Sequence, residues 1–146
     1  MGMTLQEAPD PADLTLTEED RKELIAWARD CVRRLLPVFE THRPDDDRLV
    51  DALSAVDDFR AGSLGVGPMR KLAFACHAAA RDCEDPAATA VARACGQVIA
   101  VAHMGGHARR LEGYTRKALS GPQLATELAF QRDRLPTRLQ QYVYGE

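Results

Sequence analysis

Residues 17–39, TEEDRKELIAWARDCVRRLLPVF, decide the fold class of this chain. Thr17 is followed by three acidic residues, a pattern typical of a helix N-cap whose charges offset the positive end of the helix dipole. Behind them, apolar side chains recur at three- and four-residue steps from Leu24 to Leu35. That period places them on one face of a helix. We therefore predict an amphipathic helix that begins after Thr17 and is ended or kinked at Pro37.

The rest of the chain continues this pattern of periodic apolar stretches separated by glycine and proline. Alanine, the strongest helix former, accounts for 23 of the 146 residues, and runs of β-branched residues are absent. Further helix starts are predicted near Asp45–Asp47, at Pro68, at Pro86, after Gly105-Gly106 and at Gly121-Pro122, and a last short turn follows Pro136. The helix that begins at Pro86 is expected to reach His103.

These elements predict an all-α domain over residues 16–146, a single bundle of five to six mostly antiparallel helices. Residues 1–15, which contain Pro9 and Pro11, are predicted to be a flexible leader. The charge pattern and the hydropathy pattern exclude several classes. A net charge of −3 argues against general nucleic-acid binding, and no apolar run reaches the length of a membrane span.

The expected location is the cytoplasm, because the N-terminus lacks the pattern of a signal peptide. The four cysteines fit that location. Each lies in an apolar stretch and none forms a CxxC motif, so free buried thiols are favoured over disulfides or a zinc site: Cys31, Cys76, Cys83 and Cys95.

Three histidines beside apolar helix faces are the strongest candidates for chemistry. His77, His103 and His107 can act as acid–base groups or as metal ligands near neutral pH. His103 and His107 have the four-residue spacing of a helical metal site, but the two glycines between them interrupt it. Hydrogen-bonded core histidines are the simpler interpretation, and no cofactor is expected.

Two further groups of polar residues have a structural and a functional interpretation. Arg81 follows His77 by one turn, where it offsets a helix dipole or else pairs with Asp57 or Glu127 beside a polar cavity that binds an anion. Glu127 and Gln131 share a helix face. They either orient the histidines by hydrogen bonds from outside the site or form a surface pair, and we favour the surface pair.

Several short strings, in order, resemble one bacterial family. They are Ala26-Trp27-Ala28 leading to Cys31, Leu36-Pro37-Val38-Phe39-Glu40, His77-Ala78-Ala79-Ala80-Arg81, Ala92-Arg93-Ala94-Cys95-Gly96-Gln97, Ala100-Val101-Ala102-His103, His107-Ala108, and Glu127 to Gln131 with Leu135-Pro136. The chain from about residue 20 to 143 is thereby similar to the immunity-five-like family of immunity proteins.

The resemblance implies a protein partner, since immunity proteins bind and neutralise a toxin that is encoded nearby. An acidic helical domain suits a basic toxin surface, because complementary charge accelerates encounter. Candidate contacts are the acids of the second predicted helix, which otherwise form a solvated face: Asp45, Asp46, Asp47, Asp51, Asp57 and Asp58.

Two alternatives stay open beside the binding protein. One is an enzyme or small-molecule site within the helices, with His77, His103 and His107 as catalytic groups and Arg81 as the anion ligand. We favour a protein that is not an enzyme. The other is a self-associating helical protein, a homodimer whose contact includes Tyr142, Val143 and Tyr144.

Overall fold

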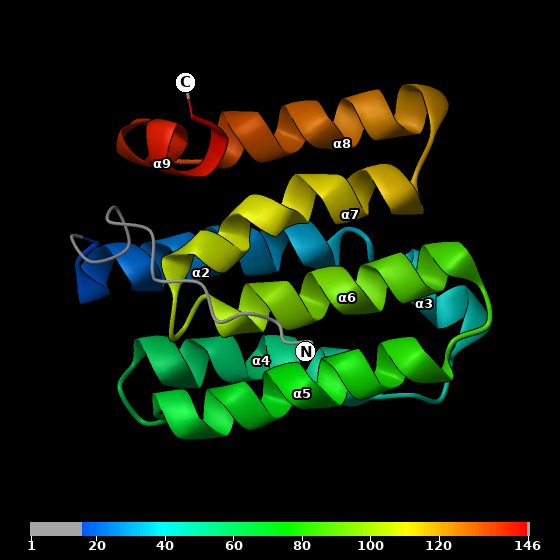
Figure 1. Ribbon diagram of the computed structural model, residues 1–146, viewed down its shortest axis with the longest axis horizontal. Helices are drawn as coiled ribbons and strands as arrows, with labels where there is room; N and C mark the ends of the chain where they lie inside the picture. The colour runs from blue at the N-terminus through cyan, green and yellow to red at the C-terminus, as the bar shows by residue number, and fades with distance from the viewer. Residues whose placement is uncertain (1–15, 146) are drawn as a thin grey trace, which may run out of the picture.

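The computed structural model describes residues 16–145, and the predicted leader over residues 1–15 lies outside them. The described residues form eight α-helices and two short 3₁₀ helices and include no β-strand, which confirms the all-α prediction for this part of the chain. The α-helices of Figure 1 are α2 (Glu18–Arg33), α3 (Leu36–His42), α4 (Arg48–Arg60), α5 (Val66–Asp82), α6 (Pro86–Ala100), α7 (Leu111–Ala118), α8 (Gly121–Arg134) and α9 (Gln140–Tyr144). The 3₁₀ helices are η1 (Gly105–Arg110) and η2 (Thr137–Leu139).

The predicted number of five to six helices is too low for the described residues. α2 ends at Arg33 and a separate helix, α3, begins at Leu36, because Pro37 is accommodated in the first turn of a new helix. The predicted last turn after Pro136 contains α9 as well as η2. Among residues 16–145, no helix combines the length and the apolar character that crossing a bilayer requires.

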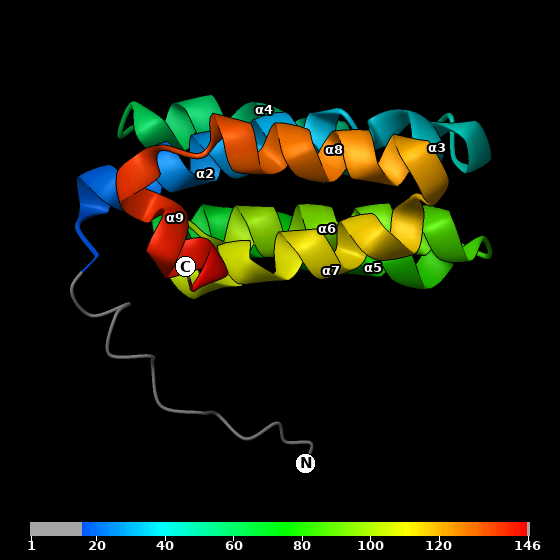
Figure 2. The ribbon, with the colours of Figure 1, turned by 90° about the horizontal axis from the view of Figure 1, so that it is seen from above.

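The helices lie in two layers (Figures 1 and 2). One layer contains α2, α3, α4 and α8, and the other contains α5, α6 and α7, with α9 at the end of the molecule where α8 finishes. From α4 to α8, helices that follow one another in the chain run antiparallel (Figure 1). The apolar core includes buried side chains from every α-helix except α8, whose Leu124 and Phe130 are partly buried and pack against it.

The helix α2 forms as its sequence predicts. The Thr17 hydroxyl caps it by accepting a hydrogen bond from the backbone N–H of Asp20 at 3.0 Å. Its apolar stripe, including Leu24, Ala28 and Cys31, is completely buried.

The helix α6 is the centre of the fold. It packs against α2, α3, α4, α5 and α7, and most of its residues are buried, as expected of a helix that is apolar nearly all round. Its start matches the prediction, because Asp85 accepts a hydrogen bond from the backbone N–H of Ala88 at 2.9 Å and Pro86 occupies the first position. Buried alanines such as Ala79 and Ala92 let the neighbouring helices approach it closely.

Two other helix starts differ in detail from the sequence prediction. α4 begins at Arg48, and Asp47 occupies its cap position without a side-chain capping bond. α5 begins at Val66, so Pro68 is its third residue rather than its first. The fold accepts this proline because the first four backbone N–H groups of a helix have no acceptor within the helix. Gly62, with φ +84°, closes the α4–α5 connection in a conformation that favours glycine.

The end of α6 determines where two of the histidines lie. The helix ends at Ala100, three residues before the predicted end at His103, which instead lies in the turn that follows. His107 lies in η1. Gly105 lies close to two side chains, because a Cβ at this position would lie 2.5 Å from Leu16 Cδ2 and 2.7 Å from the Tyr142 hydroxyl oxygen, so a larger residue would require them to move. The chain therefore bends sharply between the two histidines.

A buried polar cluster, the α2–α7–α8 cluster, joins α2 and α7 to α8. The Trp27 indole N–H donates to the carbonyl oxygen of Gln131 at 2.9 Å, and Gln131 Nε2 donates to Thr115 Oγ1 at 2.9 Å. Glu127 accepts two short hydrogen bonds from the guanidinium of Arg34, at 2.8 and 2.9 Å. Gln131 is 1% exposed and Glu127 8% exposed, so the favoured prediction of a surface pair is wrong.

Candidate functional site

The three candidate histidines lie on one small pocket between α5, α6 and the chain that follows α6. We call it the histidine pocket; its volume is about 170 Å³ and its lining residues are Arg70, Ala73, Phe74, His77, Gln97, Ala100, His103 and His107. The first four line it together because they are spaced three or four apart along one face of α5. Thus residues that lie up to 37 positions apart in the sequence share one recess.

His77 is held as a neutral imidazole by Arg93. Arg93 Nη1 lies 2.9 Å from His77 Nδ1, and since a guanidinium only donates, Nδ1 must accept and the ring proton is on Nε2. The ring lies over Gly96, where a Cβ would come within 2.6 Å of both Cε1 and Nε2. Burial lowers the pKa of His77, and the charges of Arg93 and Arg81 lower it further.

His107 is held in the opposite tautomer. Its Nδ1 lies 2.8 Å from Gln97 Oε1, an acceptor, so Nδ1 carries the proton and the lone pair is on Nε2. The ring of His103 meets the ring of His107 edge to face, with centroids 5.1 Å apart. Burial is the largest cause that lowers the pKa of each of these two histidines, and positive charge on neighbouring side chains adds to it. The pocket therefore holds uncharged imidazoles at neutral pH.

Arg81 is not among the residues that line the histidine pocket, and its side chain is exposed. Its charge reaches the site only by helping to lower the pKa of His77. The ion pair offered as its alternative role is not formed among residues 16–145, where Arg29 binds Asp57 at 2.8 Å and Arg34 binds Glu127. Arg81 lies in the last turn of α5, as its interpretation as a residue that offsets the helix dipole expects.

His103 and His107, the candidate metal ligands, lie beside each other as a pair of rings, but no third ligand side chain in the described part of the chain joins them. Among residues 16–145, no group of three or more histidine, cysteine or acidic side chains is placed to hold a metal ion. All four cysteines are free thiols, and three of them are buried. Burial raises the pKa of Cys31 to about 12, so this sulfur stays protonated and is a poor nucleophile at neutral pH.

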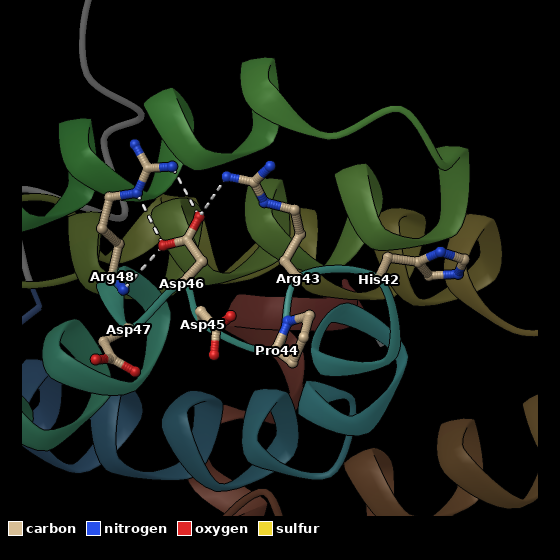
Figure 3. A pocket seen from close by; sticks show the side chains of 7 residues that line it. All are labelled: His42, Arg43, Pro44, Asp45, Asp46, Asp47 and Arg48. Atoms are coloured by element: carbon tan, nitrogen blue, oxygen red, sulfur yellow. Dashed lines mark hydrogen bonds and ion pairs between the residues drawn. The ribbon is translucent and has the colours of Figure 1, made fainter.

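The candidate acidic residues divide into two groups with different surroundings. Figure 3 shows the carboxylate of Asp46 between the guanidiniums of Arg43 and Arg48, with Asp45 and Asp47 pointing away from them. Arg48 binds Asp46 at 2.7 and 2.9 Å and also binds Asp82 at 2.8 Å. These hydrogen bonds, chiefly from Arg48, hold the pKa of Asp46 well below its ordinary value.

Asp46 and the two arginines also define a polar recess of about 420 Å³ at the α3–α4 connection, lined by residues 42–48 (Figure 3). The side chain of Asp46 is only 8% exposed. The charge of Asp46 is therefore already compensated, and it holds the two arginines that bind Asp82 of α5 rather than presenting a charge to the outside. Asp57 is likewise engaged, by Arg29.

The remaining acids form a stripe on the outer side of α4. Asp47, Asp51 and Asp58 are exposed and, at spacings of four and seven residues, lie along one line of the helix. No basic side chain in the described part of the chain lies within ion-pair distance of these three carboxylates. We call them the α4 acidic face, and Asp45 lies exposed beside its start.

The residues named for self-association contact their own chain. The Arg109 guanidinium lies 4.4 Å from the centroid of the Tyr142 ring, and that of Arg132 lies 4.1 Å from the centroid of the Tyr144 ring. Val143 is buried. The homodimer stays a prediction.

Sequence reasoning missed five residues that build the histidine pocket. Arg93 and Gln97 were not singled out because a polar residue on a helix does not reveal its tertiary partner. Gly96 carried a usable signal, since a glycine inside a helix costs about 1 kcal/mol relative to alanine and calls for a packing reason. Arg70 and Phe74 share the α5 face of His77 at three- and four-residue spacing.

The comparisons with known proteins identify a family. No curated protein and no solved structure matches this sequence. The family described as Imm-5 like putative immunity protein matches residues 14–138, which is most of the chain and includes both the histidine pocket and the α4 acidic face. The chain therefore belongs to the Imm-5 like putative immunity protein family.

Proposed function

We propose that this protein neutralises a toxin by binding it directly. The observation that carries the proposal is the family match over residues 14–138. The fold suits such a role, because a rigid helix presents its outer side chains without a change in backbone. The proposal places the protein in the cytoplasm, where its four thiols would stay reduced.

We assign the toxin contact to the α4 acidic face. Asp47, Asp51 and Asp58 are exposed carboxylates on one line of a helix, so their fields add in one direction. Such a surface favours a partner with a basic patch, which it would attract over a distance of about one Debye length. The proposed contact no longer includes Asp46 or Asp57, whose charges are compensated within the chain.

Co-expression tests the proposed function. The toxin to use is the toxic protein whose gene adjoins that of this chain, expressed in a bacterium that it kills. We expect the chain to restore growth and to form a complex with the purified toxin. Growth arrest that persists despite full expression of soluble chain, together with no complex, would refute the proposal.

A charge-reversal variant tests the surface. Asp47→Lys/Asp51→Lys/Asp58→Lys should abolish protection, whereas reversal of three exposed acids on other elements, Glu40→Lys/Glu84→Lys/Asp133→Lys, should preserve it. The two variants have the same net charge, so a general charge effect changes both equally. Loss of protection in the second variant alone would move the contact away from α4.

A further inference from the structure

The histidine pocket has polar groups that folding alone does not require. His77 and His107 are partly buried, His103 is exposed, and Phe74 at the same pocket is 62% exposed, unusually high for a phenylalanine. Gly96 leaves room for the imidazole of His77 at the cost of a glycine inside the central helix. A helical core would be more stable with alanine at position 96 and apolar residues in place of the imidazoles.

We propose that the histidine pocket binds a small carboxylic acid that carries one ring or a short apolar chain. The site lies on α5, α6 and η1, whereas the proposed toxin contact lies on α4. The two proposals therefore rest on different residues, and either can fail alone.

The charge of the lining selects an anion. Of the eight described residues that line the pocket, Arg70 is permanently cationic, three are imidazoles and none has a carboxylate. Arg93 and Arg81 lie close enough to His77, and Arg110 close enough to His107, to act on their ionisation. A cation entering this pocket would meet only positive or neutral groups, whereas a carboxylate would gain a guanidinium donor.

The two fixed tautomers determine which imidazole can receive a proton when the acid binds. Protonation of His77 would aim an Nδ1–H at the guanidinium of Arg93 and break that contact, so His77 stays neutral. Protonation of His107 keeps its Nδ1–H bond to Gln97 and adds an Nε2–H donor. The bound carboxylate therefore stabilises imidazolium at His107, with His103 as the neighbouring second titrating ring.

The size and the apolar walls select the rest of the ligand. Ala73, Ala100 and the ring of Phe74 supply carbon surface beside the polar groups. The volume of about 170 Å³ is close to that of cavities known to admit one benzene ring, about 150 Å³. A ring with one carboxylate matches both the walls and the charge.

Three probes of one shape test the proposal on the full chain: benzoate, benzamide and benzamidinium. We expect benzoate to shift the NMR signals of the histidine-pocket imidazoles saturably, with a dissociation constant on the order of 1 mM. Benzamide should bind about tenfold more weakly and benzamidinium not at all. Equal binding of benzamidinium, or no saturable shift with benzoate, would overturn the proposal.

Matched variants locate the site. Arg70→Gln should weaken benzoate binding about tenfold, whereas Arg60→Gln, an exposed arginine of α4, should leave it unchanged. Both side chains are exposed, so both variants should fold, and the dispersion of their amide spectra checks this. Unchanged affinity in Arg70→Gln would overturn the assignment of the carboxylate to this pocket.

The pH dependence of binding has a defined sign. The groups that face the imidazoles are Arg70 and Arg81 of α5, Arg93 of α6 and Arg110 of η1, all permanently charged. Only the imidazoles of His77, His103 and His107 can change charge here, and the pKa of each lies below its usual value. A bound carboxylate raises the pKa of His107, so benzoate should bind several-fold more tightly at pH 6 than at pH 8. His107→Gln should remove most of this dependence. Binding that strengthens as pH rises would contradict the proposal.

Discussion

The α2–α7–α8 cluster and the histidine pocket both place polar side chains inside a helical fold, but only the first is closed. In the cluster, the Trp27 N–H and the Gln131 amide N–H each bond to a protein acceptor, and Gln131 is 1% exposed, with its Oε1 atom buried without a partner among the described residues. In the pocket, His103 is exposed and Phe74 projects into solvent. Closed polar groups stabilise a particular helix arrangement, whereas open ones remain able to bind something else.

The largest expected difference between the two regions is in the free energy of unfolding that each loses when its glutamine is replaced by alanine. Gln131 is 1% exposed, so Gln131→Ala should lower the free energy of unfolding by about 2 kcal/mol, because it leaves a cavity and removes the donor to Thr115. Gln97→Ala should cost only about 0.5 kcal/mol, because water can replace the amide that holds His107. Urea unfolding measures both. Equal costs would show that the histidine pocket is as closed as the cluster.

Gly96 and His77 should show strong energetic coupling. In the native chain, Gly96→Ala should destabilise by about 1 kcal/mol, since its Cβ overlaps the His77 ring. In a His77→Ala background, the same change should stabilise by about 1 kcal/mol, because alanine is the better helix former. A double-mutant cycle measured by chemical denaturation gives the coupling. Additive effects would mean that the ring moves away freely.

A smaller effect is expected where the cluster reaches the surface. Glu127→Gln weakens two charge-assisted bonds from Arg34, whose side chain is 42% exposed, so solvent screening limits the loss to about 0.5–1 kcal/mol. Arg70→Gln in the histidine pocket should change stability by less than that, because no ion pair of Arg70 exists within residues 16–145. Thermal unfolding at low and high salt distinguishes the two variants, because only the loss in Glu127→Gln should shrink as salt screens the ion pair. A larger loss in Arg70→Gln would reverse the comparison.

The smallest expected effect is on the pH dependence of stability. Burial lowers the folded-state pKa of His77, His103 and His107, while unfolded histidine titrates near about 6.5. The folded chain then binds fewer protons, so stability is complete above about pH 6.5 and falls as pH drops through the folded-state pKa values. Asp46 adds a loss only below about pH 4.

Urea unfolding between about pH 7.5 and pH 5 checks this sign. The variant His77→Gln/His103→Gln/His107→Gln should lose less stability on acidification than the native chain. The fourth histidine, His42, lies outside the pocket and is common to both proteins. An equal loss in the two proteins would assign the pH dependence to other groups.

Most of the fold could be predicted from the sequence because its signals are local. Thr17 caps α2 and Pro86 begins α6 as predicted, and the apolar stripes point inward. The errors occur where tertiary contacts decide which side chain of a helix is buried. Phe130 and Gln131 are adjacent, and helical periodicity alone does not show which of them points inward. The Gln131 side chain is the buried one, and its Nε2 donates to Thr115 Oγ1 of α7, a contact that the local sequence does not reveal.

The site was predicted only in part, because the sequence shows which residues carry chemistry but not which tertiary partners they contact. The sequence singled out His77, His103 and His107, and the pocket that contains all three forms because α6 ends at Ala100 and the chain bends before η1. The partners of arginines were not predictable, since Arg29 and Arg34 bind acids 28 and 93 positions away. The same holds for Arg81, for which an ion pair with one of those two acids was one of two interpretations.

The most direct test of the proposed function is the affinity of the purified chain for the toxin encoded beside it. Three proteins should be compared: the native chain, Asp47→Lys/Asp51→Lys/Asp58→Lys, and Arg70→Gln/His107→Gln. We predict that reversal of the α4 acidic face weakens binding by at least about 100-fold, and that the pocket variant stays within about threefold of the native chain. The opposite order, with the pocket variant failing and the α4 variant binding normally, would contradict the account.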